Sequence, residues 1–325
     1  MFAEAIEDIL RDQCTPAVVR AIEGGDPGQP LWDVISQAGF LDLLRSEDDD
    51  GAALQLADLY AIVVQFGSHA APLPFAQSIA ARALVAPGVS LPAGPLSLAP
   101  TLQRLADGRL QAPLVPFGTV AGHVLSVDGG QLVLMSTVSA ECQRTGIAHS
   151  QFATLVWPDD RALERIAGDA AALLPMAAAV QSALLVGALT RVLEMSLQYC
   201  NERSQFGRSL GKFQVVQHQL AVMAEQVAAA AIASEAAFQG EGRIPRLLPA
   251  AMAKARTSEA APEVANAAHA LYGAIGVTEE FDLQLYTRRL HEGRLAHGAE
   301  NYWNRIVGET LLATDATLAE FVRAA

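Results

Sequence analysis

The second half of the chain is dominated by apolar residues that recur at alternating spacings of three and four. One stripe runs from Leu185 to Tyr199 and a second from Phe213 to Val227. Residues at these spacings share one face of an α-helix, and an apolar face has to be buried against other elements. The sequence therefore predicts two long helices that pack together.

Two further segments fit the same arrangement. Ala250 to Tyr272 has a helical pattern, with a bend expected at Pro262, and a last helical stretch starts at Leu283. Helices with buried stripes and short connections commonly form bundles. We expect residues 166–325 to form a C-terminal helical bundle.

The first part of the chain is also predicted to be helical. Residues 1–108 contain helical patterns at Ala3–Cys14, Leu31–Ala38 and Leu54–Gln65. Prolines then become frequent in the range 86–116, which excludes a long helix and marks a domain junction. We expect the N-terminal helical domain to end at this junction.

A short β region is predicted for residues 109–165. Val124–Val127 and Gln131–Met135 flank Asp128–Gly130, a pattern that is typical of a hairpin with a glycine-bearing turn. Ala153–Trp157 has the composition of one more strand. The sequence thus indicates a reduced β domain between two helical parts.

Charge and cysteine content exclude several classes of protein. Lys and Arg number 22 against 35 Asp and Glu, a net charge of −13, which argues against binding of nucleic acid. Cys14, Cys142 and Cys200 lie far apart and the histidines do not cluster, so neither a disulfide framework nor a metal site is expected. The N-terminus lacks the basic and apolar regions of a secretory signal, and we expect a cytoplasmic protein.

One stretch has the length of a membrane span, because Ala170–Thr190 carries no charge. Its apolarity is mostly that of Ala, it contains Pro175 and Gln181, and the helical period continues into charged residues beyond it. An Ala-rich helix that is buried on most faces gives the same signal. We therefore expect a buried helix and no membrane span.

The break between the two long helices has unusual chemistry. It places Arg203, Arg208 and Lys212 in an otherwise acidic protein, beside two glycines, Phe206 and Phe213, just before a helix N-terminus. Guanidinium groups and free backbone N–H groups bind phosphate, and an aromatic ring can lie against a purine. The same residues also fit an ordinary helix connection with solvated cations and packed Phe side chains. The two interpretations are equal on physical grounds.

The break also resembles a family signature. Residues 199–214, YCNERSQFGRSLGKFQ, are similar to the Y-x-x-x-R-x-Q-F-G-x-x-I/L-x-x-F-Q motif of the acyl-CoA dehydrogenase family. Supporting matches include Phe66-Gly67 and the segment from Gly273 to Glu280, and the resemblance covers nearly the whole chain. It implies a mainly α fold with an N-terminal helical domain, a reduced middle β domain and a C-terminal four-helix bundle.

The resemblance implies an activity as well. Members of this family are flavoproteins of lipid metabolism that use FAD to oxidise an acyl-CoA to the 2,3-enoyl-CoA. A Glu removes the α-proton while a hydride leaves the β-carbon for the flavin, and an electron-accepting flavoprotein then takes the electrons. By this resemblance the chain is expected to be an oxidoreductase with an acyl-CoA substrate.

Several roles carry over by position. The resemblance makes Arg203 a ligand of the FAD pyrophosphate, Phe206 a neighbour of the adenine and Gln214 a contact of the adenosine. In the family these contacts, and those of the glycine turn, reach the cofactor of a neighbouring subunit, so at least a dimer is implied. The default interpretation of Gly273 alone is a helix C-terminal cap. The cofactor-binding candidates are Arg203, Phe206, Gly207, Phe213, Gln214, Gly273 and Gly276.

The catalytic base is the main departure from the family pattern. One branch carries its Glu just before a C-terminal Gly-Thr, where this chain has His297, and the other carries it on the helix before the signature, near Ala177. The family's T-E-x-x-x-G-S-D stretch has no match, and Ala270 and Ala274 replace a Gln and a Gly of the glycine turn. Glu280 and His297 are the catalytic candidates, although Glu280 better suits an acidic pair at a helix N-terminus.

Two functional hypotheses follow. The first is an FAD-dependent acyl-CoA dehydrogenase that lacks the base and works in a heteromer with a base-bearing paralogue, which we favour over a self-sufficient homo-oligomer. The second is a non-catalytic helical scaffold or interaction protein that kept the fold and lost the flavin. Retention of Arg203, Phe206 and Gln214 argues against the scaffold.

Overall fold

Helices form the N-terminal part of the molecule. The computed structural model describes residues 2–240 and 242–324. The N-terminal helices are Phe2–Gln13 (α1), Pro16–Glu23 (α2), Gln29–Gln37 (α3), Leu56–Ser68 (α4) and Phe75–Leu84 (α5). Helices α1, α3 and α4 confirm the three predicted helical segments, with bounds shifted by a few residues.

The sequence did not predict α2 and α5, and each has a physical reason. Helix α2 is only 8 residues long and is defined by its start, where Thr15 accepts a hydrogen bond from the Val18 amide and Pro16 takes the first position. Helix α5 is buried on nearly all sides, so it has no polar face to give a helical period.

The middle region contains two four-stranded sheets. The first has the order β1-β4-β5-β8 and the second β2-β3-β7-β6. The predicted hairpin is confirmed as β4 and β5, joined by Gly129 and Gly130 with φ of 56° and 78°. The strands are Leu96–Ala99 (β1), Gln103–Arg104 (β2), Leu110–Val115 (β3), His123–Asp128 (β4), Gln131–Ser136 (β5), Glu141–Arg144 (β6), Ala153–Trp157 (β7) and Glu164–Ile166 (β8).

This β region is larger than the hairpin and single strand that the sequence predicted. Strands β1 and β2 lie inside the range 1–108, which was expected to be helical. Apolar residues of both sheets, including Met135 and Leu155, form a core of their own, and the Trp157 indole donates a hydrogen bond of 2.8 Å to Ser136 O. Strands β2, β6 and β8 were missed because they are only 2, 4 and 3 residues long. Strands β1 and β3 were missed because Pro95, Pro100 and Pro113 lie beside or within them, which reads as a break in the sequence.

The C-terminal part is the predicted helical bundle. Helix α6 packs against α4, α7, α8 and α9, and α8 continues through Pro262 without ending. The backbones of α4 and α6 come so close that a Cβ placed on Gly187 would lie 2.1 Å from Val64 O. The helices are Leu173–Glu202 (α6), Gln214–Ala236 (α7), Leu247–Tyr272 (α8), Leu283–Leu295 (α9), Glu300–Leu312 (α10) and Leu318–Ala324 (α11).

Helix α6 is the uncharged stretch singled out in the sequence. By length and composition it is apolar enough to cross a membrane, with a mean hydropathy of 1.7 over its window, but 83% of that window is buried inside the protein. It therefore has the environment of the core helix that the sequence predicted.

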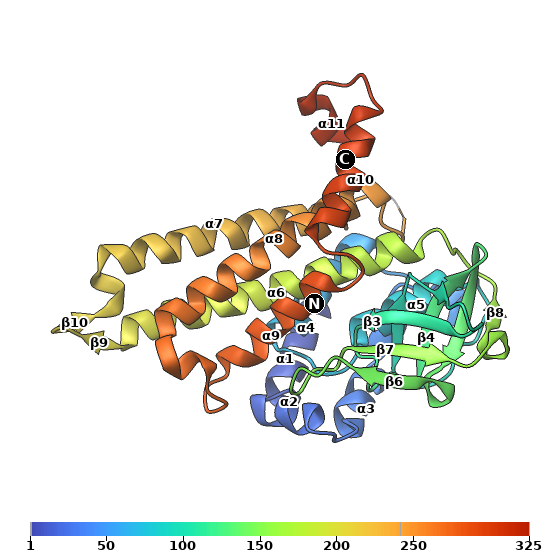
Figure 1. The fold of residues 1–325 in the computed structure, drawn as a ribbon, viewed down its shortest axis with the longest axis horizontal. Coiled ribbons are helices and arrows are strands. Elements are labelled where there is room, and N and C mark those ends of the chain that lie inside the picture. The colour runs from blue at the N-terminus through green and yellow to red at the C-terminus, as the bar shows by residue number, and fades with distance from the viewer. Residues whose placement is uncertain (1, 241, 325) are drawn as a thin grey trace.

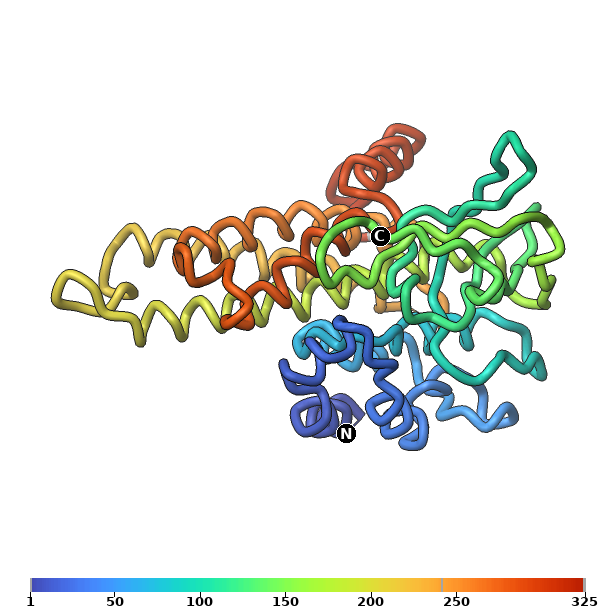
Figure 2. Tube along the Cα trace, turned by 60° about the horizontal axis from the view of Figure 1, so that its bottom comes forward, coloured from blue at the N-terminus to red at the C-terminus, as the bar shows by residue number. Residues whose placement is uncertain are grey.

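The three parts are arranged unequally along the molecule. The sheets and the N-terminal helices gather around one end of α6, while α6, α7 and α8 extend well beyond them (Figure 1). Figure 2 shows the N-terminal helices along one side of the bundle and the sheets at its right-hand end. The connection between α6 and α7 thus lies at the far tip, away from the sheets.

Candidate functional site

The connection at the tip, Arg203–Phe213, is a small structured element that we call the elbow. Ser204–Gln205 (β9) pairs with Arg208–Ser209 (β10), and the turn between them has φ of 53° at Phe206 and 80° at Gly207. The Leu210 amide donates to Arg203 O at 2.9 Å, and a short 3₁₀ turn leads into α7. Glycine at position 207 suits its positive φ, so the tight turn follows from the sequence.

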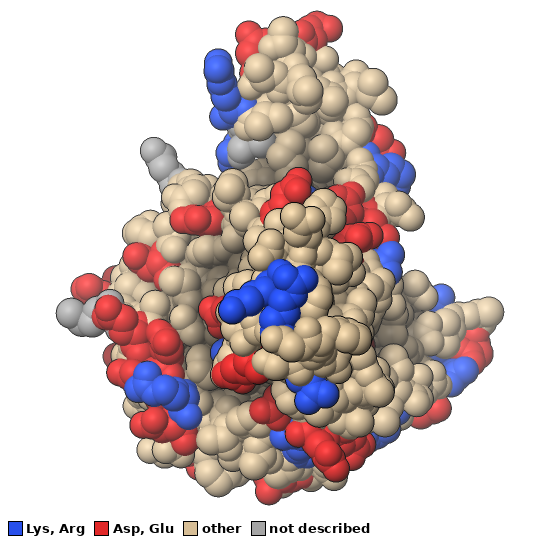
Figure 3. All heavy atoms as spheres, turned by 90° about the vertical axis from the view of Figure 1, so that its left-hand side faces the viewer, with Lys and Arg blue, Asp and Glu red and all other residues tan. Residues whose placement is uncertain are grey.

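The elbow presents cations and an aromatic ring to its surroundings. Phe206 is 89% exposed, and the Arg208 guanidinium lies 4.0 Å from the centre of the Phe213 ring. In the described part of the chain, Arg203, Arg208 and Lys212 form no ion pair with an acidic side chain. The end-on view shows Lys and Arg side chains clustered over the middle of this face (Figure 3). An anionic ligand is the natural partner of such a cluster.

The elbow lies beside the glycine turn that the sequence also singled out. Together they line a cavity of about 490 Å³, the elbow cavity, formed by Tyr199, Arg203, Gln205, Leu210 and residues 270–275. Gly273 has a φ of 64°, and the Tyr199 and Tyr272 rings stack 4.1 Å apart and fix the turn against α6. Two candidate segments from separate parts of the sequence therefore line one cavity.

Not every cofactor candidate lines this cavity. Gln214 is exposed at the first position of α7, and Phe206 and Gly207 form the outer turn of the elbow. Gly276 is buried, and a Cβ there would lie 2.8 Å from the Tyr272 Cβ, which gives this glycine a packing role. The structure thus brings Arg203 and Gly273 to one cavity, which the other cofactor candidates do not line.

His297 lies at the opposite end of the bundle, next to the sheets. It lines a cavity of about 220 Å³, the His297 cavity, together with Leu174, Leu295, Gly298, Tyr302, residues 98–101 and residues 113–115. None of these lining residues is an Asp or a Glu. Burial, with the nearby Lys254 charge, lowers the pKa of His297 to about 3. The ring is therefore neutral at physiological pH and accepts a proton only weakly.

Lys254 holds the turn that carries His297. Its side chain is fully buried, and its ammonium donates to Ser258 Oγ at 2.8 Å, to Arg294 O at 2.9 Å and to Gly298 O at 3.0 Å. The Trp303 indole donates to the same Gly298 carbonyl. These bonds satisfy carbonyls at the end of α9 and fix His297 in its left-handed conformation, with φ of 56°.

The two catalytic candidates do not share a cavity. Glu280 is exposed and lines a surface pocket of about 260 Å³ with Arg191, Tyr199, Glu202 and Tyr272, at the glycine-turn end of the bundle. Ala177 is buried in α6 and carries no ionisable group. The structure therefore places no carboxylate beside His297 among the residues that line its cavity.

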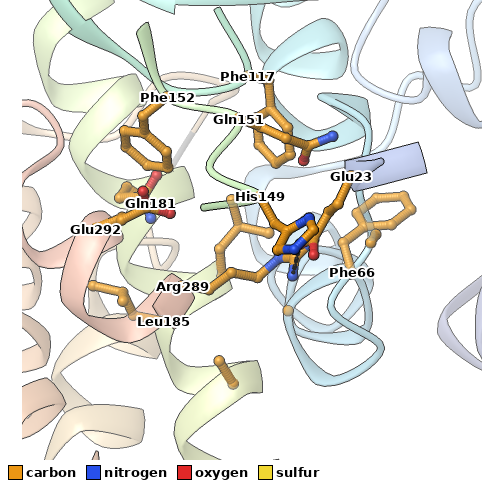
Figure 4. A pocket seen from close by; sticks show the side chains of 14 residues that line it. Glu23, Phe66, Phe117, His149, Gln151, Phe152, Gln181, Leu185, Arg289 and Glu292 are labelled. Atoms are coloured by element: carbon orange, nitrogen blue, oxygen red, sulfur yellow. Dashed lines mark hydrogen bonds and ion pairs between the residues drawn. The ribbon is translucent and has the colours of Figure 1, made fainter. Parts of the chain in front are cut away.

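A third cavity, which sequence reasoning missed, lies where all three parts meet (Figure 4). We call it the Glu292 cavity. Glu292 and Arg289 project from α9, and burial raises the pKa of Glu292. The signal was present in the sequence as charged residues within the apolar pattern of α9, but they resemble an exposed face. The lining residues are Glu23, Phe66, Gly67, Ala71, Phe117, His149, Gln151, Phe152, Gln181, Leu184, Leu185, Ala188, Arg289 and Glu292.

Comparison with known proteins places this architecture. The family model described as acyl-CoA dehydrogenase, C-terminal domain, matches residues 168–312. Acyl-CoA dehydrogenase IpdE2 of Mycobacterium tuberculosis is 30% identical over 304 residues, which cover 90% of each chain. Acyl-CoA dehydrogenase IpdE2 of Mycolicibacterium smegmatis is 28% identical over 303 residues, which cover 90% of this chain and 91% of the relative.

Solved structures agree on the fold. A chain of the ChsE4-ChsE5 complex from Mycobacterium tuberculosis superposes with a TM-score of 0.84 at 21% identity, and 97% of each chain is covered. The glutaryl-coenzyme A dehydrogenase complex with glutaryl-CoA gives a TM-score of 0.76 at 18% identity, over 96% of this chain and 94% of the other. Because the Mycobacterium tuberculosis relative is 30% identical over 90% of each chain, this chain belongs to the acyl-CoA dehydrogenase family.

Proposed function

We propose that this chain binds FAD and acts in the cytoplasm as the base-lacking subunit of a heteromeric acyl-CoA dehydrogenase. The observation that carries the proposal is a contrast between the two ends of the bundle. The elbow keeps unpaired cations and an exposed ring, whereas the His297 cavity contains no carboxylate. The chain thus offers the means to hold a dinucleotide at the tip, while the described residues of its His297 cavity offer no carboxylate to remove an α-proton.

The residues at the tip fit the phosphate and adenine end of FAD. Arg203 lines a cavity that the glycine turn also lines, and the Phe206 ring is 89% exposed. Cations beside exposed backbone bind pyrophosphate, and an aromatic ring can stack on a purine. Because the tip is remote from the His297 cavity, the FAD held here belongs to an adjacent subunit, as the family resemblance implies.

The His297 cavity is the proposed place of the reacting carbons. FAD, when bound, would accept the hydride that leaves the β-carbon of the acyl group. A neutral His297 can donate one hydrogen bond to a carbonyl oxygen, and the apolar side chains around it exclude water. A conjugate acid with a pKa near 3 makes a poor base for carbon acids, so the proton is left to another subunit.

The solved relatives support a heteromer. The ChsE4-ChsE5 structure is named as a complex of two proteins, and its fold matches this chain over nearly its whole length. In the proposed assembly the partner is a paralogue that supplies the catalytic Glu, the substrate is an acyl-CoA, and an electron-accepting flavoprotein removes the electrons.

Reconstitution of the purified chain with FAD, and then with a base-bearing paralogue, tests this proposal. The chain purified alone, reconstituted with FAD, should show the visible absorption of a bound flavin and oxidise acyl-CoA esters poorly. Activity with an artificial electron acceptor should appear when a base-bearing paralogue is added. Absence of flavin uptake, alone and with the paralogue, would favour the scaffold hypothesis. Full activity of the isolated chain would show that a base is present within it.

A further inference from the structure

The Glu292 cavity contains two buried polar atoms without a partner. Glu292 Oε1 and Arg289 Nη2 make no hydrogen bond within the described part of the chain, although both atoms are inaccessible to solvent. The Glu292 residue as a whole is only 9% exposed. Leaving such a group unsatisfied costs about 1–3 kcal/mol, so it calls for a ligand or a water.

Hydrogen bonds from the second guanidinium nitrogen, Nη1, hold Arg289 in place. Its Nη1 donates to Glu23 Oε1 at 2.8 Å and to Leu285 O at 3.1 Å, while Arg288 binds the second oxygen of Glu23 at 2.7 Å. The Glu23 side chain is 4% exposed. The free Nη2 is thus a donor with a fixed position rather than a mobile surface group.

The rest of the cavity is apolar. In Figure 4, Phe152 and Gln181 lie near Glu292, while His149 and Glu23 lie near Arg289, and aromatic rings close the cavity above and to one side. Leucine and alanine side chains of α6 complete the wall. A cavity with apolar walls and a few placed polar groups selects a mostly apolar ligand that carries a polar function.

The size and position of the cavity point to one end of an acyl group. Its volume is about 50 Å³, and a water-sized group needs roughly 10–15 Å³, so only a few non-hydrogen atoms fit. Helices α6 and α9 each contribute residues to both this cavity and the His297 cavity. Leu174 and Gln181 are two turns apart on α6, about 10 Å, and Glu292 and Leu295 are one turn apart on α9.

We propose that the Glu292 cavity receives the far end of the acyl group, and that Glu292 and Arg289 select acyl groups with an uncharged oxygen function there. This inference rests on the proposed function. A hydroxyl or carbonyl oxygen accepts from Arg289 Nη2, and Glu292 accepts from a hydroxyl or, when protonated, donates to a carbonyl. A plain hydrocarbon end leaves both atoms unsatisfied. A carboxylate end is disfavoured because it would be the third carboxyl group beside Glu23 and Glu292, whereas Arg289 is the one arginine among the described residues that line the cavity and its charge is already paired with Glu23.

Calorimetric titration of the full chain with pairs of CoA esters tests the inference without turnover. The pairs are straight-chain esters from butanoyl-CoA to decanoyl-CoA and their ω-hydroxy counterparts, with adipoyl-CoA as a carboxylate-ended ester and free CoA as a control. At the chain length that reaches the cavity, the ω-hydroxy ester should bind about tenfold more tightly than the plain ester, which is the gain expected from one good hydrogen bond. The carboxylate-ended ester should bind no better than the plain one.

Variants identify the residue responsible. Glu292→Leu should reduce the preference for the ω-hydroxy ester, because only the Arg289 donor remains. Glu292→Gln should keep most of it, and Glu225→Leu on the exposed face of α7 should leave it unchanged. A wild-type chain that binds the esters equally at every length overturns the inference and indicates a cavity that holds only water. A preference of undiminished size in Glu292→Leu also overturns it. A chain that takes up FAD but shows no preference leaves the proposed function intact, whereas one that binds no acyl-CoA ester overturns both.

Discussion

The Lys254 ammonium lies 3.0 Å from Gly298 O and 2.9 Å from Arg294 O, and no carboxylate of residues 2–240 or 242–324 forms an ion pair with it. Burial is the main reason why the pKa of Lys254 falls from 10.5 to about 7. The folded protein therefore disfavours the charged form that the unfolded chain keeps up to pH 10.5. This penalty is complete below pH 7 and is relieved as the pH rises toward 10.5.

A pH series of unfolding experiments tests this relationship. Between pH 7 and 10 the unfolded chain binds more protons at this position, so the free energy of unfolding should gain about 1.4 kcal/mol per pH unit from Lys254. The Lys254→Met variant should lack this contribution, and the difference between the two proteins isolates it from other groups. Parallel pH profiles for wild type and variant would show that Lys254 does not titrate in this range.

A carboxylate at position 297 should raise the activity of the isolated chain. His297→Glu places a potential base in the cavity beside Lys254, whose charge favours ionisation of the new carboxyl group. We expect at least about a tenfold gain in acyl-CoA oxidation with an artificial acceptor, short of the roughly 10²–10⁴ that an evolved base supplies. His218→Glu, on the exposed face of α7, is the matched control. An equal gain in both variants would point to a general charge effect.

Loss of the Arg203 guanidinium should weaken FAD retention. Arg203→Ala removes one charge-assisted phosphate contact, worth about 1.5–3 kcal/mol, so the dissociation constant should rise about 10- to 100-fold. Fluorescence titration with FAD measures the change. Arg161→Ala removes an exposed arginine of the β region, whose side chain is 91% exposed, and should leave the constant unaltered. Equal affinity of wild type and Arg203→Ala would remove Arg203 from the site.

The close approach of α4 and α6 predicts opposite effects for two glycines. A Cβ on Gly187 would lie 2.1 Å from Val64 O, so Gly187→Ala should destabilise the protein by at least about 1–3 kcal/mol. A Cβ on Gly308 of α10 has no neighbour within 4 Å, and Gly308→Ala should stabilise by about 0.5–1 kcal/mol through helix propensity. Denaturant unfolding of both variants decides whether backbone proximity is the cause.

The long helices could be predicted from sequence because burial on one face leaves a period. Phe213 to Val227 shows that period, and α7 follows it over its whole length. Helix α5 and strand β1 could not be predicted in the same way, since each is buried on nearly all sides and offers no alternation of apolar and polar residues. Strands lie on both sides of the range 109–165 that was predicted for the β domain. The domain bounds stay a prediction.

The candidate functional residues likewise fall into those that the sequence could predict and those that it could not. The elbow was predictable because Arg203 and its neighbours form a local sequence motif with an evident chemistry. The Glu292 cavity was not, because Glu23, Gln181 and Glu292 belong to three elements that only the fold brings together. A charged residue within a helical pattern looks solvent-exposed until its packing partners are known.

Helix α6 carries residues of all three cavities, with Leu174 at one end, Gln181 to Ala188 in the middle and Tyr199 near the other. Adding or deleting a single residue within it would rotate everything beyond by about 100° and shift it by about 1.5 Å. All the later contacts would be misaligned at once. Substitutions can therefore change one cavity at a time. Insertions or deletions between Leu174 and Tyr199 would disturb the cavities together, so the length of this segment is constrained.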